Sequence, residues 1–113
     1  MTTLPRNEIQ KNFHHLMTDP NAWRVVKYEF EISFETGVLE LIILTFKSES
    51  GGIKKLKFIN PRIADYSQLQ IPDGSNLYIA DIRSLGWNIK FEVGGWEEEM
   101  SSLFWADSVE EIF

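Results

Sequence analysis

The chain has 113 residues, no cysteine and a net charge of −6 at pH 7. This length is sufficient for one domain with its own hydrophobic core, without metals or cross-links. The lack of cysteine excludes a disulfide framework and any thiolate zinc site. The acidic balance argues against nucleic acid as a partner, because the phosphate backbone is also negative.

The charges are unevenly distributed along the chain. Residues 47–62 are mainly basic, whereas residues 92–113 carry carboxylates and no lysine or arginine, which favours a basic partner. The first residues lack the apolar run of a secretory signal, and the longest apolar run, 41–44, is far too short to span a bilayer. We therefore expect a soluble, cytoplasmic protein with no membrane segment.

The first predicted element is a helix over residues 7–17. Asn7 is a suitable N-cap, and Gln10 follows three residues later, as in a capping box. The apolar residues fall on one helical stripe, which we expect to lie on a sheet. They are Ile9, Phe13, Leu16 and Met17.

A β-hairpin over residues 22–46 is the stretch around which the chain is organised. Its first half alternates strictly, which predicts a strand with one apolar and one polar face. The apolar positions are Val26, Tyr28, Phe30, Ile32 and Phe34. After a turn at Thr36-Gly37, residues 38–46 are apolar at odd and even positions alike, except at Glu40 and Thr45. We expect this second strand to be central and covered on both faces.

The remaining elements are also strands. In residues 53–59, Leu56 and Phe58 alternate with Lys55 and Lys57, which predicts a third antiparallel strand. We expect its lysine face either to be solvated or to protect an edge strand from aggregation. Residues 62–72 have no clean period and predict a long connection. A terminal meander follows, with an alternating strand at residues 87–93 that is ended by Gly94-Gly95. Its other strands are predicted at residues 77–82, 103–106 and 109–113.

These elements predict a mainly β (α+β) fold in a single domain, residues 1–113. Six to eight short strands separated by turns are typical of an antiparallel sandwich or roll, here with one N-terminal helix. Neither a repeat nor a linker divides the chain.

No catalytic or metal-binding motif is present. The sequence lacks a phosphate loop, a Gly-x-Ser-x-Gly elbow and a calcium loop. His14 and His15 are adjacent on the predicted helix and diverge by about 100°, so they are not expected to share a metal. We therefore predict no catalytic residue, no metal, no cofactor and no enzymatic activity.

An acidic, aromatic region near the C-terminus is the predicted partner-binding site. Large aromatic side chains anchor interfaces, and surrounding carboxylates steer a basic partner. The predicted residues are Trp96, Glu97, Glu98, Glu99, Trp105, Asp107, Glu110 and Glu111. In the alternative interpretation, the tryptophans belong to the core and the glutamates to the solvated face of the meander.

The last third also resembles the C-terminal half of small bacterial immunity-type proteins. The matching pattern is a short strand 77–82 with Asp-Ile, a turn with Trp87, the strand 91–93, the acidic stretch 96–98 and the aromatic segment 103–107. A cysteine often found in the final strands of that family is replaced here by Trp105-Ala106. The resemblance implies a cytoplasmic protein that binds and neutralises a partner toxin.

Three other functions remain open at the sequence level. An enzyme of unfamiliar type predicts a carboxylate with a strongly raised pKa in a cleft. A small-molecule carrier with a barrel or roll cavity predicts an apolar cavity, whereas an inhibitor predicts a filled core. A self-associating structural domain predicts a homo-oligomer, in which a strand edge or the apolar C-terminal residues Ile112 and Phe113 are buried by a second copy.

Overall fold

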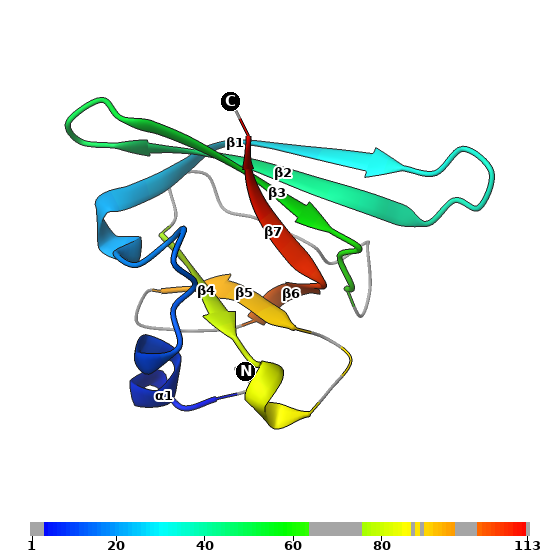
Figure 1. Ribbon diagram of the computed structural model, residues 1–113. Helices are drawn as coiled ribbons and strands as arrows, with labels where there is room; N and C mark the ends of the chain where they lie inside the picture. The colour runs from blue at the N-terminus through cyan, green and yellow to red at the C-terminus, as the bar shows by residue number, and fades with distance from the viewer. Residues whose placement is uncertain (1–3, 64–75, 87, 89, 97–101, 113) are drawn as a thin grey trace.

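The computed structural model describes residues 4–63, 76–86, 88, 90–96 and 102–112, and this part of the chain is mainly β. It contains seven strands in two antiparallel sheets, one α-helix, α1 (Arg6–Lys11), and two short 3-10 helices, η1 (Pro20–Ala22) and η3 (Arg83–Leu85) (Figure 1). The strands are β1 (Trp23–Ile32), β2 (Leu39–Ser48), β3 (Ile53–Ile59), β4 (Leu77–Asp81), β5 (Phe91–Gly95), β6 (Ser102–Ala106) and β7 (Ser108–Ile112). The predicted fold class is confirmed.

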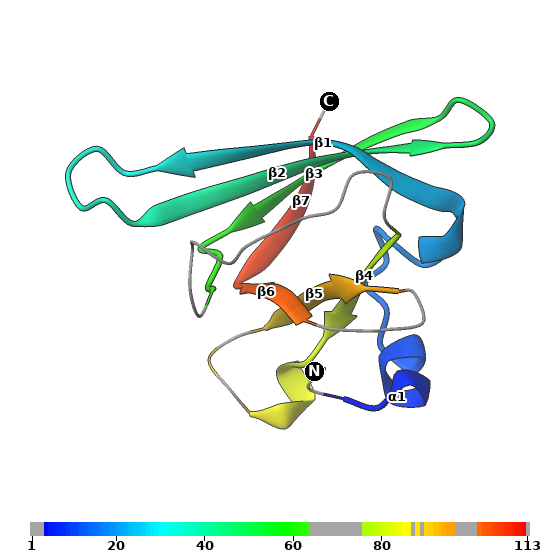
Figure 2. The same ribbon diagram turned by 180° about the vertical axis from the view of Figure 1, so that it is seen from behind.

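The two sheets lie face to face. The larger sheet has the order β1-β2-β3-β7, and the smaller sheet has the order β4-β5-β6 (Figures 1 and 2). Asp107 alone separates β6 from β7, so the chain crosses from one sheet to the other at this residue. The predicted terminal meander is therefore split, because its last strand pairs with β3 rather than with β6.

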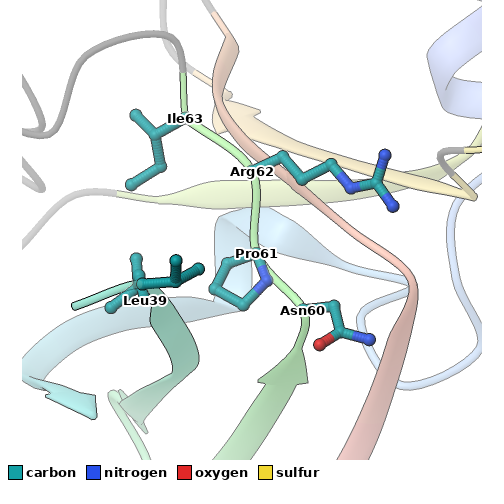
Figure 3. Close-up of a pocket in the computed structure, with 6 residues that line it drawn as sticks. Leu39, Asn60, Pro61, Arg62 and Ile63 are labelled. Carbon is teal, nitrogen blue, oxygen red and sulfur yellow. The ribbon is translucent and has the colours of Figure 1, made fainter. Parts of the chain in front are cut away.

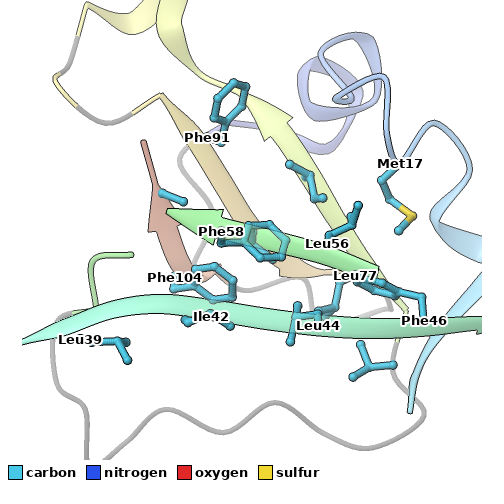
Figure 4. Packing of buried hydrophobic residues seen from close by; sticks show 14 residues of the cluster. Met17, Leu39, Ile42, Leu44, Phe46, Leu56, Phe58, Leu77, Phe91 and Phe104 are labelled. Atoms are coloured by element: carbon cyan, nitrogen blue, oxygen red, sulfur yellow. The ribbon is translucent and has the colours of Figure 1, made fainter. Parts of the chain in front are cut away.

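The main core fills the space between the sheets. Alternate residues of β2 and β3 point inward against residues of the smaller sheet, and Phe58 meets Phe104 edge to face at 5.1 Å between ring centroids (Figure 4). Each fully buried side chain of this size contributes about 1.5–3 kcal/mol. The fully buried members include Ile42, Leu44, Phe46, Leu56, Phe58, Leu77, Ile79, Val93 and Phe104.

The N-terminal segment covers the outer face of the smaller sheet. There Ile9 packs with Tyr78, Ala80, Ile82 and Trp96 in a second buried cluster. The two layers of core explain how a small chain buries both faces of a three-stranded sheet.

The N-terminal helix is shorter than the predicted range 7–17, and its N-cap is Pro5 without a side-chain capping bond. It ends at Lys11 because the following backbone bonds to the edge of β4. The N–H of Asp81 donates to the carbonyl of Asn12 at 2.8 Å, and the N–H of His14 donates to the carbonyl of Ile79 at 2.8 Å. A sheet edge thus replaces the last helical turns.

The apolar positions of β1 differ most from expectation. Val25 is the β1 residue in the core, and a register shift between Val25 and Lys27 follows it. Because of this bulge, the inward-facing positions of β1 change from odd-numbered residues such as Val25 to even-numbered residues such as Tyr28. The alternating apolar residues beyond it are all at least 44% exposed, and Phe34 lies in the turn. Both views show the β1–β2 hairpin extending past the smaller sheet (Figures 1 and 2).

Other local predictions are corrected by the larger sheet. β2 is central, as predicted, but its outward residues Leu41 and Ile43 are only half-buried. β3 is an interior strand between β2 and β7, so Lys55 and Lys57 line its outer face rather than a sheet edge, whereas the Lys54 ammonium donates to the carbonyl of Leu16 at 2.6 Å. Gly94 and Gly95 belong to β5, which ends at Gly95 rather than before Gly94. The predictions for Trp87, Ile89 and most of the connection 62–72 lie outside the described residues.

Candidate functional site

Three cross-strand pairs define an uncovered part of the inner face of the larger sheet. Directly paired residues of antiparallel strands point to the same face. In each pair the β2 residue is buried and the β1 residue is exposed. The pairs are Tyr28 (44% exposed) with Leu44 (0%), Phe30 (44%) with Ile42 (0%), and Ile32 (62%) with Leu39 (6%). The smaller sheet therefore covers β2 but leaves β1 open to solvent.

Exposed apolar residues continue along the chain from these β1 positions into the turn. The rings of Tyr28 and Phe30 lie 5.5 Å apart. We define the hairpin face as Tyr28, Phe30, Ile32, Phe34 and Val38, of which Phe34 and Val38 are 103% and 52% exposed. Single exposed apolar residues are common, but a contiguous group is characteristic of a binding surface.

The same hairpin is acidic. Residues 28–46 contain Glu29, Glu31, Glu35 and Glu40 and no lysine or arginine. At its base, Lys27 lies 2.7 Å from Glu29, and the hydrogen bond from this lysine lowers the pKa of the Glu29 carboxyl. The hairpin thus carries carboxylates and exposed aromatic rings together, with Glu29 and Glu31 on the face of β1 opposite the rings. The same combination of residue types was the basis of the site predicted in the C-terminal region.

A hollow of about 380 Å³ lies where the hairpin face reaches the end of β3. It is open to solvent, and Val38 and Leu39 belong both to its wall and to the hairpin. Figure 3 shows the side chains of Ile63 and Arg62 pointing to opposite sides of the chain, as expected for neighbours in an extended segment. The lining residues are Val38, Leu39, Asn60, Pro61, Arg62 and Ile63.

Asp107 lies beside this hollow and holds its polar wall. Its Oδ2 accepts a hydrogen bond from the Asn60 side chain at 3.3 Å and lies 3.6 Å from Nη2 of Arg62. Asn60 adopts a left-handed backbone conformation, with φ of 52°, where the chain leaves β3. Through Asn60 and Arg62, Asp107 is thus connected to the hollow that Val38 and Leu39 also line.

Trp96 lies in the core, in agreement with the alternative interpretation of the sequence and not with its prediction as a partner-binding residue. The residue is 5% exposed. Its ring meets those of Phe13 and Tyr78 edge to face, with ring centroids 5.0 Å and 6.0 Å apart. The guanidinium carbon of Arg6 lies over the same ring, 4.1 Å from its centroid. This position results from the N-terminal segment folding over the smaller sheet. Trp96 therefore stabilises the second cluster and offers little surface to a partner.

Trp105 is half-buried and takes part in a polar network inside the same sheet. Its Nε1–H donates to Oε2 of Glu92 at 3.2 Å, and the hydroxyl of Tyr78 donates to Oε1 of Glu92 at 2.7 Å. Burial and then the Glu92 hydrogen bond raise the pKa of Tyr78. Glu92, fully buried, was not among the predicted site residues, because it alternates with apolar residues as solvated glutamates do.

Glu110 and Glu111, the remaining predicted residues within the described part of the chain, do not share a surface. Glu110 pairs with Lys57 on the outer face of the larger sheet, whereas Glu111 pairs with Leu56 and points to the inner face. Glu97, Glu98 and Glu99 lie outside the described residues. The described members of the predicted region are thus distributed over the core, the hollow and both faces of β7.

The histidines and carboxylates form no metal site in the described part of the chain, where no group of three potential ligands comes together. His14 and His15 stack at 4.4 Å, and burial, followed by the charge of His15, lowers the pKa of His14. Among the described helices, none has the length and apolar character needed to cross a bilayer.

No protein-family model, curated protein or solved structure is significantly similar to this chain. The site is therefore assigned from its own geometry. The signal for the hairpin face was present in the sequence as the alternation of aromatic residues with glutamates, but that pattern is equally typical of a strand whose apolar face is covered.

Proposed function

We propose that the chain is a non-catalytic protein-binding module whose partner binds on the hairpin face. The observation that carries this proposal is the contrast within the three β1–β2 pairs, in which the β1 member is exposed and the β2 member is buried. Aromatic side chains that stay in water do not contribute the favourable free energy of apolar burial. A partner that covers them would gain that free energy on binding.

The partner is expected to be basic. The hairpin that presents this face also carries Glu29, Glu31, Glu35 and Glu40, with Glu29 and Glu31 on the opposite face of β1, and the whole chain has a net charge of −6. Complementary charge accelerates association and selects among partners, while the aromatic rings supply most of the binding energy. Neither nucleic acid nor a membrane fits this charge.

Within this class we propose an immunity-type inhibitor that acts in the cytoplasm and neutralises a basic toxin. The support is the resemblance of the last third to such proteins, together with the acidic binding surface. A toxin that acts on nucleic acid needs a basic groove, and an acidic inhibitor is suited to occupy it.

A capture experiment tests the binding surface. Tagged wild-type protein is incubated with lysate of the source organism at low and high salt and compared with the double variant Tyr28→Ser/Phe30→Ser. We expect a basic protein that high salt releases, with recovery reduced at least about tenfold by the double variant. Ile53→Ser is the matched control, because Ile53 is 67% exposed and lies outside the hairpin face.

Two results would contradict the proposal at different levels. Equal capture by the folded double variant would exclude the hairpin face as the binding surface. If the captured protein arrests growth when it is expressed alone, co-expression of this chain should restore growth. Unrelieved arrest would exclude the inhibitor role and leave a binding module.

A small-molecule carrier is the second candidate. The hollow beside Pro61 has a volume within the range of ligand pockets, and its apolar wall includes Leu39 and Ile63. The space between the two sheets, in contrast, is filled by side chains (Figure 4). Because the hollow is continuous with the hairpin face through Val38, we assign it to an anchoring side chain of the protein partner.

A further inference from the structure

The edges of the two sheets differ in how they are closed. In the smaller sheet, the edge of β4 bonds to the backbone of Asn12 and His14. The edge of β6 is closed by Arg62, whose N–H donates to the Trp105 carbonyl at 2.7 Å and whose carbonyl accepts from the Trp105 N–H at 3.1 Å. Both edges are thus occupied by other segments of this chain.

The larger sheet ends in β7 on one side and β1 on the other. β7 has five residues and carries Glu110 and Glu111, and a short charged strand is a poor template for pairing. β1 has ten residues. Among the described residues, no backbone hydrogen bond from another segment reaches its outer edge between Arg24 and Ile32.

Side chains on β1 specify what could pair with this edge. Tyr28, Phe30 and Ile32 project on the inner face, and Lys27, Glu29 and Glu31 project on the outer face. Lys27 is already bound to Glu29 at 2.7 Å. A strand added beside β1 would place apolar residues against the aromatic rings and, at alternate positions, residues against the glutamates.

We propose that the partner adds a β-strand to the open edge of β1, and that this strand alternates basic and apolar residues. Its apolar side chains would cover the hairpin face, and its lysines or arginines would pair with the glutamates of β1. This inference rests on the proposed function and specifies how the partner binds: main-chain hydrogen bonds supply affinity, and alternate side chains supply specificity.

A second copy of this chain is expected to bind the β1 edge less tightly than a basic strand, because its own strand is acidic. In a symmetric antiparallel pairing centred on Phe30, Glu29 of each copy would face Glu31 of the other. In a pairing centred on Glu29, the two Glu29 side chains would meet, and Lys27 of each copy would face Glu31 of the other only by leaving its contact with its own Glu29. Like charges directly opposite each other destabilise a sheet, so the chemistry favours a basic strand.

A peptide titration with amide exchange tests strand addition. The probe is a short synthetic peptide in which lysine alternates with valine, and the control peptide has glutamate in place of lysine. At ten times its Kd, we expect the lysine peptide to slow exchange of alternate β1 amides, those pointing away from β2, by about tenfold. The glutamate peptide should bind at least about tenfold more weakly at low salt.

Three results would overturn the proposal. They are the absence of lysine-peptide binding at about 1 mM, binding that leaves the β1 amides unprotected, and a free protein that sediments as a dimer with these amides already protected. If one of these occurs while Tyr28→Ser/Phe30→Ser still abolishes capture of the partner, strand addition fails and the protein-binding function stands.

Discussion

Tyr28 and Leu44 lie directly opposite each other across β1 and β2, yet Tyr28 is 44% exposed and Leu44 is fully buried. The pair marks the limit of the core. On one side of it, side chains pack between the sheets, and on the other side they meet solvent. The boundary falls within a pair of bonded strands rather than between elements.

The first prediction uses this contrast. Leu44→Ala should lower the free energy of unfolding by about 2–5 kcal/mol, because it leaves a cavity between the sheets. Tyr28→Ala should change it by about 0.5 kcal/mol or less, as is usual for surface positions. Urea denaturation of the two variants measures both values. A large loss for Tyr28→Ala would mean that its ring is covered in solution, in conflict with the hairpin face.

The same boundary separates the features of β1 that its sequence predicts from those that it does not. The alternation from Val26 to Phe34 correctly predicted a strand as far as Ile32, because strand geometry is a local property. Whether its apolar face is covered depends on the extent of the smaller sheet, which is built from residues far along the chain. The local pattern contains no information on that extent.

Other differences have the same non-local origin. The helical stripe of Ile9 and Met17 is buried as expected, but the helix ends early because β4, about seventy residues away, supplies hydrogen-bond partners to Asn12 and His14. Trp96 is buried because the N-terminal segment folds over it. A site predicted from neighbouring residues alone could not include these contacts.

The second prediction concerns high pH. Burial and the hydrogen bond to Glu92 raise the pKa of Tyr78 above the ordinary tyrosine value near 10. The unfolded chain therefore releases the tyrosyl proton first, so the stabilisation is complete below about pH 10 and declines as the pH rises further, by at most about 1.4 kcal/mol per pH unit. Tyr78→Phe should remove this component of the decline.

Tyr78→Phe should also cost about 1–3 kcal/mol at neutral pH, because the Glu92 carboxylate loses a buried donor. Tyr28→Phe, which removes an exposed hydroxyl, is the control and should follow the wild type at both pH values. Thermal denaturation between neutral pH and pH 11 measures the difference. An unchanged alkaline decline in Tyr78→Phe would show that other groups cause it.

The third prediction concerns His14 and mildly acidic pH. Burial, followed by the charge of His15, lowers the pKa of His14 below the ordinary value near 6.5. The unfolded chain then binds the proton first, so the stabilisation is present above about pH 6.5 and is lost as the pH falls through the folded-state pKa. Proton NMR titration of the His14 ring measures this pKa directly.

His14→Asn should remove that component of the acid dependence, because the asparagine amide does not titrate. Its side-chain oxygen can still accept from the Leu16 N–H, which lies 3.1 Å from Nδ1 of His14. His15→Asn should instead raise the pKa of His14, because it removes a neighbouring positive charge. A His14 ring that titrates at or above the ordinary value would contradict the burial described for it.

The fourth prediction distinguishes the two candidate binding surfaces. Glu31, Glu35 and Glu40 are changed to lysine in one variant, and Glu97, Glu98 and Glu99 in another. Each variant replaces three negative charges by three positive ones and brings the net charge from −6 to 0, so total charge cannot explain a difference between them. If the partner binds on the hairpin face, the first variant should lose affinity for the captured partner by at least about tenfold at low salt.

The salt dependence completes this test. Exposed charges are screened at high ionic strength, so the affinities of the first variant and the wild type should converge as salt is added. The second variant should keep close to wild-type affinity at every salt concentration. The reverse order, with the Glu97–Glu99 variant losing the partner and the hairpin variant retaining it, would return the binding site to the acidic C-terminal region and remove the hairpin face from the interface.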